Sequence, residues 1–166
     1  MKKNKQLKVV MDNIPYVGML IIGALTIATS FLFSTNGIIG ALSYLLYGIL
    51  GSLWVMIFVC PYCHGYGNDG CPSGYGKLSA KMVKKKDQQF FAQKFKKNIA
   101  VIVPLWIIPA VCGVIGLIQV FSWLMLFLVL IFIVDAWIIL PMLSKKEGCN
   151  RCPQKNQCPW MKKKKM

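Results

Sequence analysis

The sequence predicts an all-α membrane protein with four transmembrane helices, arranged as two hairpins, with a cysteine-rich loop and tail on the cytoplasmic side. Hydrophobic residues make up 56% of the 166 residues, yet the formal net charge is +15. No charged residue or histidine occurs in residues 14–59 or 98–134. About 20 apolar residues cross a bilayer, so each run is long enough for two spans. The composition excludes a soluble enzyme, a secreted disulfide miniprotein and a disordered basic protein.

Each long apolar run is interrupted once. The tetrapeptide Ser34-Thr35-Asn36-Gly37 is a turn signal and divides the first run into spans 14–33 and 37–59. A second break, near residues 119–122, leaves spans of about 98–118 and 120–143. The predicted organisation is a basic N-terminal arm (1–13), a first hairpin (14–59), a cysteine-rich loop with a basic amphipathic segment (60–97), a second hairpin (98–143) and a cysteine-rich basic tail (144–166).

The basic residues predict the orientation of the spans. The N-terminal arm carries four, the segment between the second and third spans eight and the tail eight, which accounts for all 20 Lys and Arg. Both hairpin turns have none. Because positive segments resist translocation, we expect an integral protein of the cell membrane with both termini in the cytoplasm. The first span has no clear cleavage site after it and is interpreted as a retained signal anchor.

The basic segment also suggests partners other than the bilayer core. Residues 77–97 interleave lysines with apolar side chains at partly helical spacing, which suits an amphipathic helix in the membrane interface. The apolar members are Leu78, Met82, Phe90, Phe91 and Phe95. The expected partner of this face is anionic lipid or a soluble acidic protein, although topology alone also explains the lysines. No nucleic-acid recognition motif occurs, so nucleic acid is not an expected partner.

Six of the seven cysteines lie outside the spans and form two triplets with C-x2-C-x7-C and C-x2-C-x5-C spacing. The first triplet is Cys60, Cys63 and Cys71; the second is Cys149, Cys152 and Cys158. Each follows the second span of a hairpin, so the chain reads as one unit repeated twice. Parallel repeats would bring the triplets together. Clustered thiols in a reducing compartment are more often metal ligands or redox centres than disulfides, which predicts a shared or paired metal site.

The pentapeptide Cys60-Pro61-Tyr62-Cys63-His64 fits three patterns. It matches C-x-x-C-H haem attachment, but covalent haem is added on the opposite side of the membrane. It matches a glutaredoxin-like C-P-Y-C, but a reactive thiolate needs a helix N-terminus and this motif follows a helix C-terminus. As part of a metal knuckle it also uses Cys71 and the second triplet, and this third interpretation is favoured.

Iron–sulfur and zinc are the two candidate cofactors. Zinc takes four N or S ligands, which Cys60, Cys63, Cys71 and His64 would supply, although adjacent Cys63 and His64 bind one ion awkwardly. An iron–sulfur cluster takes four thiolates, which three cysteines of one triplet and one of the other would supply. Proline follows four of these cysteines, and such Cys-Pro pairs are frequent around ferredoxin-type clusters. The pattern therefore favours iron–sulfur, with zinc as the alternative.

Four Cys-Pro motifs carry a resemblance to a known class: Cys60-Pro61, Cys71-Pro72-Ser73-Gly74, Cys152-Pro153 and Cys158-Pro159. With four spans, the chain resembles the membrane-bound ferredoxin-like proteins that supply electrons to periplasmic nitrate reductase and related systems. The resemblance implies electron exchange between quinol and protein partners. Those proteins space the membrane motif as C-x-x-x-C-P and carry full four-cysteine repeats, and this chain departs from both features.

Asp135 is the formally charged residue inside a span. It precedes Cys149 by fourteen residues, which is roughly 20 Å of helix, so it is expected in mid-membrane. A carboxylate there costs at least about 2.5 kcal/mol. One interpretation gives Asp135 a catalytic role in proton exchange near a quinone or substrate cavity. The other is a protonated Asp bonded to a neighbour, with Ser43, Tyr44 and Tyr47 as candidates.

Four functional hypotheses follow. The first is a small iron–sulfur membrane protein that passes electrons between a cytoplasmic partner and the membrane, with quinone as the lipid-side partner. The second is a zinc-stabilised membrane scaffold or docking protein. A membrane thiol-disulfide oxidoreductase is less favoured because it needs its cysteines on the oxidising side. A metal transporter is weakly disfavoured by the few ligand side chains within the spans.

Overall fold

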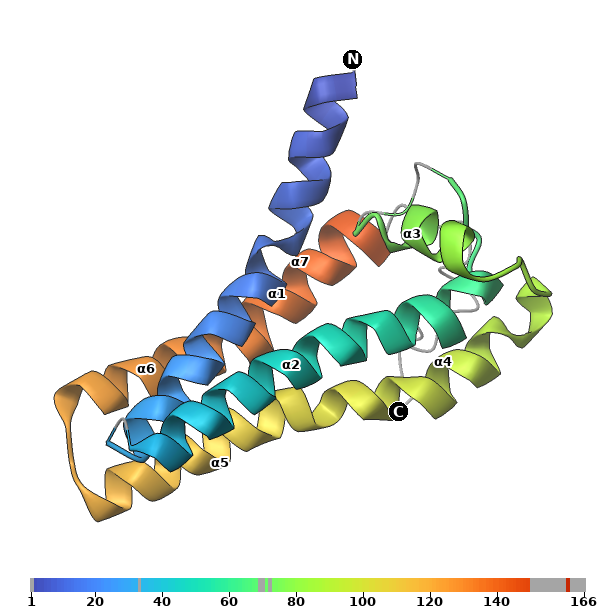
Figure 1. The fold of residues 1–166 in the computed structure, drawn as a ribbon. Helices are drawn as coiled ribbons and strands as arrows, with labels where there is room; N and C mark the ends of the chain where they lie inside the picture. The colour runs from blue at the N-terminus through green and yellow to red at the C-terminus, as the bar shows by residue number, and fades with distance from the viewer. Residues whose placement is uncertain (1, 33, 69–70, 72, 150–160, 162–166) are drawn as a thin grey trace, which may run out of the picture. The chain divides into compact units, whose positions relative to one another are not determined.

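The computed structural model describes residues 2–32, 34–68, 71, 73–149 and 161 (Figure 1). Within these residues the chain is helical and contains no strand. It divides into two compact units. Unit 1 comprises Met1–Asn13, Ser52–Val101 and Met142–Met166, and unit 2 comprises Ile14–Gly51 and Ile102–Pro141. Each unit is described by itself.

Seven α-helices occur in the described part of the chain: α1 (Lys2–Ser30), α2 (Thr35–Phe58), α3 (Tyr75–Met82), α4 (Phe91–Ile99), α5 (Val103–Gln119), α6 (Trp123–Val134) and α7 (Leu140–Leu143). Short 3₁₀ turns at Cys60–Tyr62, Gln88–Phe90 and Ala100–Ile102 connect them. Asp135–Ile139 and Ser144–Cys149 are π-helical turns.

Four helical segments are long and apolar enough to cross a membrane: Val9–Ser30, Thr35–Tyr62, Gln88–Gln119 and Trp123–Lys146. The prediction of four helices long and apolar enough to span a membrane is therefore confirmed. The two predicted breaks are also present, since α2 begins at Thr35 and α6 at Trp123. At the first break Leu32 adopts a left-handed φ of 50°, which ends α1 sharply.

Small residues allow the helices of unit 2 to approach closely. A Cβ at Gly113 of α5 would lie 2.8 Å from Cγ2 of Thr26 in α1, and one at Gly116 would lie 3.0 Å from the Cα of Ser30. Thr26 and Ser30 are themselves buried, and their hydroxyls donate to backbone carbonyls one turn earlier. Such small-residue contacts, rather than bulky interdigitation alone, are typical of helix packing in lipid.

One buried hydrogen bond in unit 2 follows directly from a proline. Pro109 is fully buried inside α5 and has no N–H for the carbonyl of Leu105, four residues earlier. The Tyr44 hydroxyl of α2 donates to this carbonyl oxygen at 2.9 Å. Figure 1 shows α2 and α5 side by side over this stretch. The side chain of one helix thus satisfies the backbone group that the proline of another leaves without a partner.

Three local features add detail to the organisation expected from the sequence. The N-terminal arm is helical, since α1 begins at Lys2. The third span contains a 3₁₀ turn before α5, where Pro104 occupies the first helical turn and cannot continue the hydrogen bonding of α4. The amphipathic segment is two helices, because Val83 turns extended after α3 and Asp87 caps the following turn with its side chain.

Unit 1 contains a small hydrophobic cluster of its own. Val59 and Phe91 are buried at its centre. The half-buried members around them are Val55, Tyr62, Cys63, Phe95 and Met161. Trp54 of α2 also reaches α4, where its indole N–H donates to Oδ1 of Asn98 at 3.2 Å. Unit 1 therefore joins the end of α2, the cysteine-rich loop and α4.

Candidate metal-thiolate site

The first cysteine triplet begins where α2 ends. Cys60, Pro61 and Tyr62 form a 3₁₀ turn, and the amide N–H of Cys63 donates back to the carbonyl of Cys60 at 3.0 Å. Proline suits the first positions of such a turn because its N–H would have no partner there. Cys60 is buried and Cys63 is half-buried. The C-x2-C spacing thus becomes one tight turn at the end of a span.

Cys71 returns to this turn through a loop closed by backbone hydrogen bonds. The N–H of Gly67 donates to the carbonyl of Gly76 at 3.0 Å, and the N–H of Lys86 donates to the carbonyl of Pro61 at 3.0 Å. The Sγ of Cys71 accepts a hydrogen bond from the Gly76 N–H at 3.4 Å. Gly76 lies in the first turn of α3, so the sulfur of Cys71 is held at the N-terminal end of this helix.

Two glycines make room for Cys71. A Cβ at Gly76 would overlap the carbonyl oxygen of Gly65 and lie 3.2 Å from the Cβ of Cys71. A Cβ at Gly65 would lie 3.3 Å from the same atom. The glycine-rich composition of this loop therefore has a steric cause at these two positions, and both place the backbone close to a cysteine.

Tyr75 is a half-buried phenol at the start of α3, next to the cysteine-rich loop. Burial raises the pKa of its hydroxyl, and negative charge on Cys60 or Cys71 would raise this pKa further.

Positive charge surrounds the C-x2-C turn. The ammonium groups of Lys86 and Lys94 lie 5.5 and 5.8 Å from the centre of the Tyr62 ring, within range of a cation–π interaction. Tyr62 lies between Cys60 and Cys63 in the sequence. Two positive charges therefore lie close to the residue between the two cysteines of this turn.

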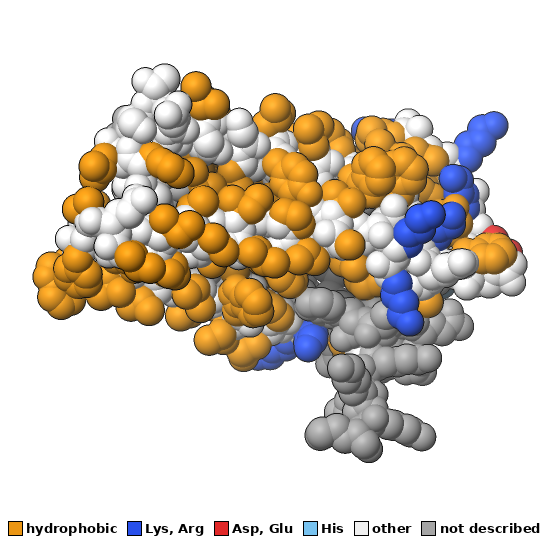
Figure 2. Space-filling view, turned by 90° about the horizontal axis from the view of Figure 1, so that it is seen from below, with side chains coloured by type: hydrophobic (Ala, Val, Ile, Leu, Met, Phe, Trp, Pro, Cys, Tyr) orange, Lys and Arg blue, Asp and Glu red, His pale blue; other side chains and the backbone are white. Residues whose placement is uncertain are grey.

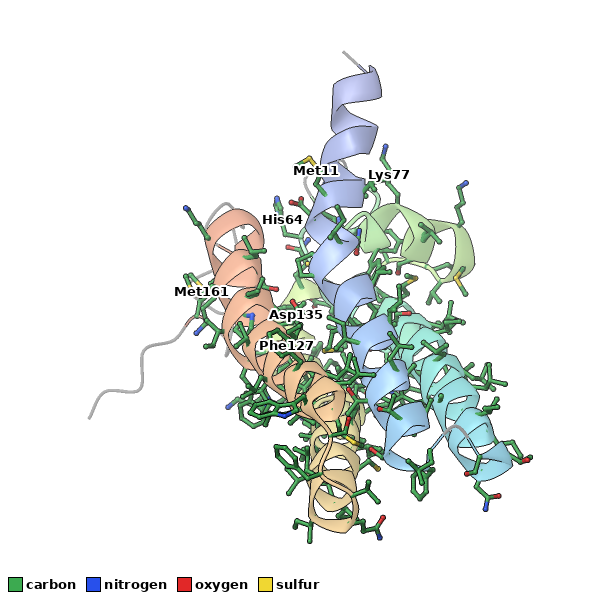
Figure 3. All side chains as sticks on the ribbon, turned by 90° about the vertical axis from the view of Figure 1, so that its left-hand side faces the viewer. Met11, His64, Lys77, Phe127, Asp135 and Met161 are labelled. Carbon is green, nitrogen blue, oxygen red and sulfur yellow. The ribbon has the colours of Figure 1, made fainter. Side chains whose placement is uncertain are left out.

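The second triplet falls largely outside the described residues. Cys149 is the last residue of the π-helical turn Ser144–Cys149, and nothing is described of its side chain. Cys152 and Cys158 lie outside the described residues. Met161, three residues after Cys158, packs in the same hydrophobic cluster as Cys63. Figure 3 labels Met161 and His64. Met161 and Cys63 therefore both pack against the core formed by Val59 and Phe91.

The described side chains do not by themselves form a complete metal site. Among them, no three His, Cys, Asp or Glu groups are arranged to hold one ion. His64 is exposed and adjoins Cys63, while Cys112 is half-buried within α5 and remote in sequence from both triplets. A metal centre at the first triplet therefore needs ligands beyond the described ones or a rearrangement of the three thiols.

Asp135 lies in unit 2, where it is 7% exposed at the start of a π-helical turn. Its Oδ2 lies 3.5 Å from the position that a Cβ on Gly18 would occupy. This oxygen has no hydrogen-bond partner among the described residues. Tyr44, one candidate partner, donates to Leu105 instead. Asp135 thus begins a π-helical turn, a feature that recurs at functional sites.

Sequence reasoning identified every cysteine of this region but missed its local partners. Gly76 as a hydrogen-bond donor to sulfur, and Tyr75 beside two thiols, were not singled out. The signal available was the glycine-rich spacing after Cys71, which also suits an ordinary turn.

No protein-family model matches the chain, and no curated protein or solved structure matches it significantly.

Proposed function

We propose that this chain is an integral membrane metalloprotein whose two cysteine triplets hold one iron–sulfur centre and transfer electrons between a soluble partner and the membrane. The observation that carries the proposal is the environment of Cys71. Its sulfur accepts a backbone hydrogen bond at the start of α3, and it shares Tyr75 with Cys60. Hydrogen bonds to cluster sulfurs are one of the means by which proteins set reduction potentials.

The second triplet would complete the ligand set. Both cysteine-rich segments fall within the residue ranges of unit 1, and Met161 packs against the cluster that contains Cys63. Three thiolates from Cys60, Cys63 and Cys71 plus one from the tail match the four that a cluster needs.

The proposed topology has two hairpins, with both termini and the cysteines on the cytoplasmic side. All 20 Lys and Arg lie in the residue ranges of unit 1 and none in those of unit 2. On the face drawn in Figure 2 the lysine side chains gather over unit 1, while the side chains along the helices of unit 2 are mostly hydrophobic. Such an asymmetry favours retention of the basic segments in the cytoplasm.

A quinone is the lipid-side partner that this chemistry suits. Its full reduction takes two electrons and two protons, and the centre would deliver the electrons one at a time. Asp135 would exchange a proton in the membrane interior, where it is buried and its Oδ2 lacks a partner among the described residues. A carboxyl in this position is a functional-site hypothesis in any membrane span.

The test is the metal and acid-labile sulfide content of protein purified in detergent without oxygen, together with its absorption spectrum. We expect iron and sulfide in comparable amounts, and absorbance at about 400 nm that bleaches on reduction. Zinc without sulfide would contradict electron transfer and favour the docking scaffold, for which His64 is the candidate fourth ligand. Metal-free protein with a titratable disulfide would contradict both and favour thiol chemistry.

A further inference from the structure

We propose that α3 and the lysine run that follows it bind anionic phospholipid headgroups of the bilayer that the chain spans. Three features of unit 1 carry this: the two faces of α3, the charge of the segment after it, and the position of α3 beside the end of a span. The proposal does not require a metal centre, so the two can fail independently.

The inner face of α3 is fixed against the cysteine-rich loop. Gly76 and Ser79 are buried, and they lie on one side of the helix at a spacing of three residues. α3 contacts the turn Cys60–Tyr62, and the Tyr66 hydroxyl donates to the carbonyl of Val83 just beyond the end of α3. These contacts set the orientation of α3 within unit 1. The face of α3 opposite Gly76 and Ser79 is exposed.

The outward face carries an apolar row and a basic row side by side. Leu78 and Met82 are each 51% exposed and lie four residues apart, one helical turn from each other. Lys77 and Lys81 form the neighbouring row with the same spacing, and both are exposed. This is the arrangement of an interfacial helix, whose apolar row enters the acyl boundary while lysines extend to the headgroups.

The segment after α3 adds charge of one sign. Lys84, Lys85 and Lys86 are consecutive and exposed. The single carboxylate of residues 77–97 is Asp87, whose Oδ1 caps the following turn by accepting from the N–H of Gln89 at 3.1 Å. Phe90, 46% exposed, adds a further apolar side chain next to this run. Clusters of basic residues next to a span bind anionic headgroups in this way.

Unit 1 also contains the last part of the second candidate span and the first part of the third. The last residues of α2, from Ser52 to Phe58, belong to it, and Trp54 of this stretch bonds Asn98, which lies within the third candidate span, Gln88–Gln119. Tryptophan is enriched at the membrane–water interface. α3 is thus held in one compact unit with the ends of two spans. An acidic protein would match the lysines but not the exposed row of Leu78 and Met82, so lipid is the better fit.

The experiment measures hydrogen exchange of residues 75–90 in the full-length protein in nanodiscs. One set of discs contains phosphatidylcholine alone and the other contains phosphatidylcholine with phosphatidylglycerol. Exchange in α3 is expected to be slower in the anionic discs by about fivefold or more, since each lysine near an anionic surface contributes about that factor. The difference is expected to disappear at high salt.

Two pairs of variants separate lipid binding from general effects. The triple variant Lys81→Gln, Lys84→Gln, Lys85→Gln is expected to lose the slowing, whereas Lys162→Gln, Lys163→Gln, Lys164→Gln removes equal charge from the tail and is expected to keep it. Leu78→Ser with Met82→Ser is expected to raise exchange in both discs, and Ala80→Ser, also at an exposed position of α3, is not. Metal content, measured on the same samples, tests the proposed iron–sulfur centre separately.

Equal exchange of α3 in both kinds of disc, in protein that retains its helix content, would overturn the proposal. So would slowing that survives the triple lysine variant. Protection of α3 that appears only when a soluble acidic protein is added, and is the same in both lipids, would also overturn it and assign the surface to a protein partner.

Discussion

The two units of this chain handle polar groups in opposite ways. In unit 2 the described helices bury hydroxyls and a carboxyl among apolar side chains, and single contacts such as Tyr44 with Leu105 satisfy the backbone. In unit 1 most of the described lysines are exposed, Cys63 and Cys71 are half-buried, and Cys60 is buried. The difference teaches that basic charge is concentrated in unit 1, which also contains the proposed metal centre, while unit 2 buries its one carboxyl, that of Asp135, among apolar side chains.

The largest effect is expected from Gly76→Ala, which alters the cysteine-rich loop of unit 1. Its Cβ would overlap the carbonyl oxygen of Gly65, so the loop must open around Cys71. We expect loss of most bound metal with the helix content retained, measured by metal analysis and circular dichroism. Gly51→Ala is the matched control, because its Cβ would lie 3.8 Å from the nearest atom, a Leu105 methyl. Full metal in Gly76→Ala would show that the loop is not part of the centre.

Gly113→Ala, a change within unit 2, is expected to lower the stability of the fold and to leave metal binding unchanged. Gly113→Ala places a Cβ 2.8 Å from the Thr26 methyl and against Val129, so α1, α5 and α6 must separate slightly. Overpacking of this kind costs about 1–3 kcal/mol. Unfolding in mixed detergent should therefore begin at lower denaturant, while metal content per folded chain stays unchanged. A variant that lost metal but not stability would contradict the separation of the two units.

Tyr44→Phe tests the hydrogen bond that the proline requires. Removal of the hydroxyl leaves the Leu105 carbonyl without a donor, at a cost of about 0.6–1.7 kcal/mol inside a membrane. Tyr16→Phe is the comparison, since the Tyr16 hydroxyl also donates to a backbone carbonyl, that of Gly48 at 2.9 Å. No proline lies four residues after Gly48, so its carbonyl keeps a helical donor. Equal losses of unfolding free energy in the two variants would contradict the role given to Pro109.

How much of this was predictable differs between the units for physical reasons. The spans and their breaks follow from hydropathy and turn residues, and the structure confirms them. The helical arm and the division of residues 77–97 at Val83 were not predictable, because a run of lysines is compatible with either helix or loop. The partnership of Tyr44 with Leu105 joins residues 61 positions apart, and no local pattern marks it. The cysteine sets were found by spacing, but spacing does not give distances between sulfurs.

The smallest effect is expected from Tyr62→Leu. The change removes the ring that Lys86 and Lys94 approach while keeping an apolar side chain in the cluster around Val59 and Phe91. An exposed cation–π contact contributes about 0.5–1 kcal/mol. The thermal unfolding temperature, Tm, should therefore fall by a few degrees at most. Metal content should be unchanged, and a marked loss of metal would instead place the Tyr62 ring in the support of the centre.

The measurement that tests the central claim most directly is the number of metal ions per chain in three cysteine variants and the parent chain, purified without oxygen. Cys71→Ser removes one ligand of the first triplet, and the triple variant Cys149→Ser, Cys152→Ser, Cys158→Ser removes every thiol of the second, so both are expected to lose the metal almost completely. Cys112→Ser, within α5, and the parent chain are expected to retain it equally. Full metal in the triple variant together with its loss in Cys71→Ser would contradict a centre shared by the two triplets.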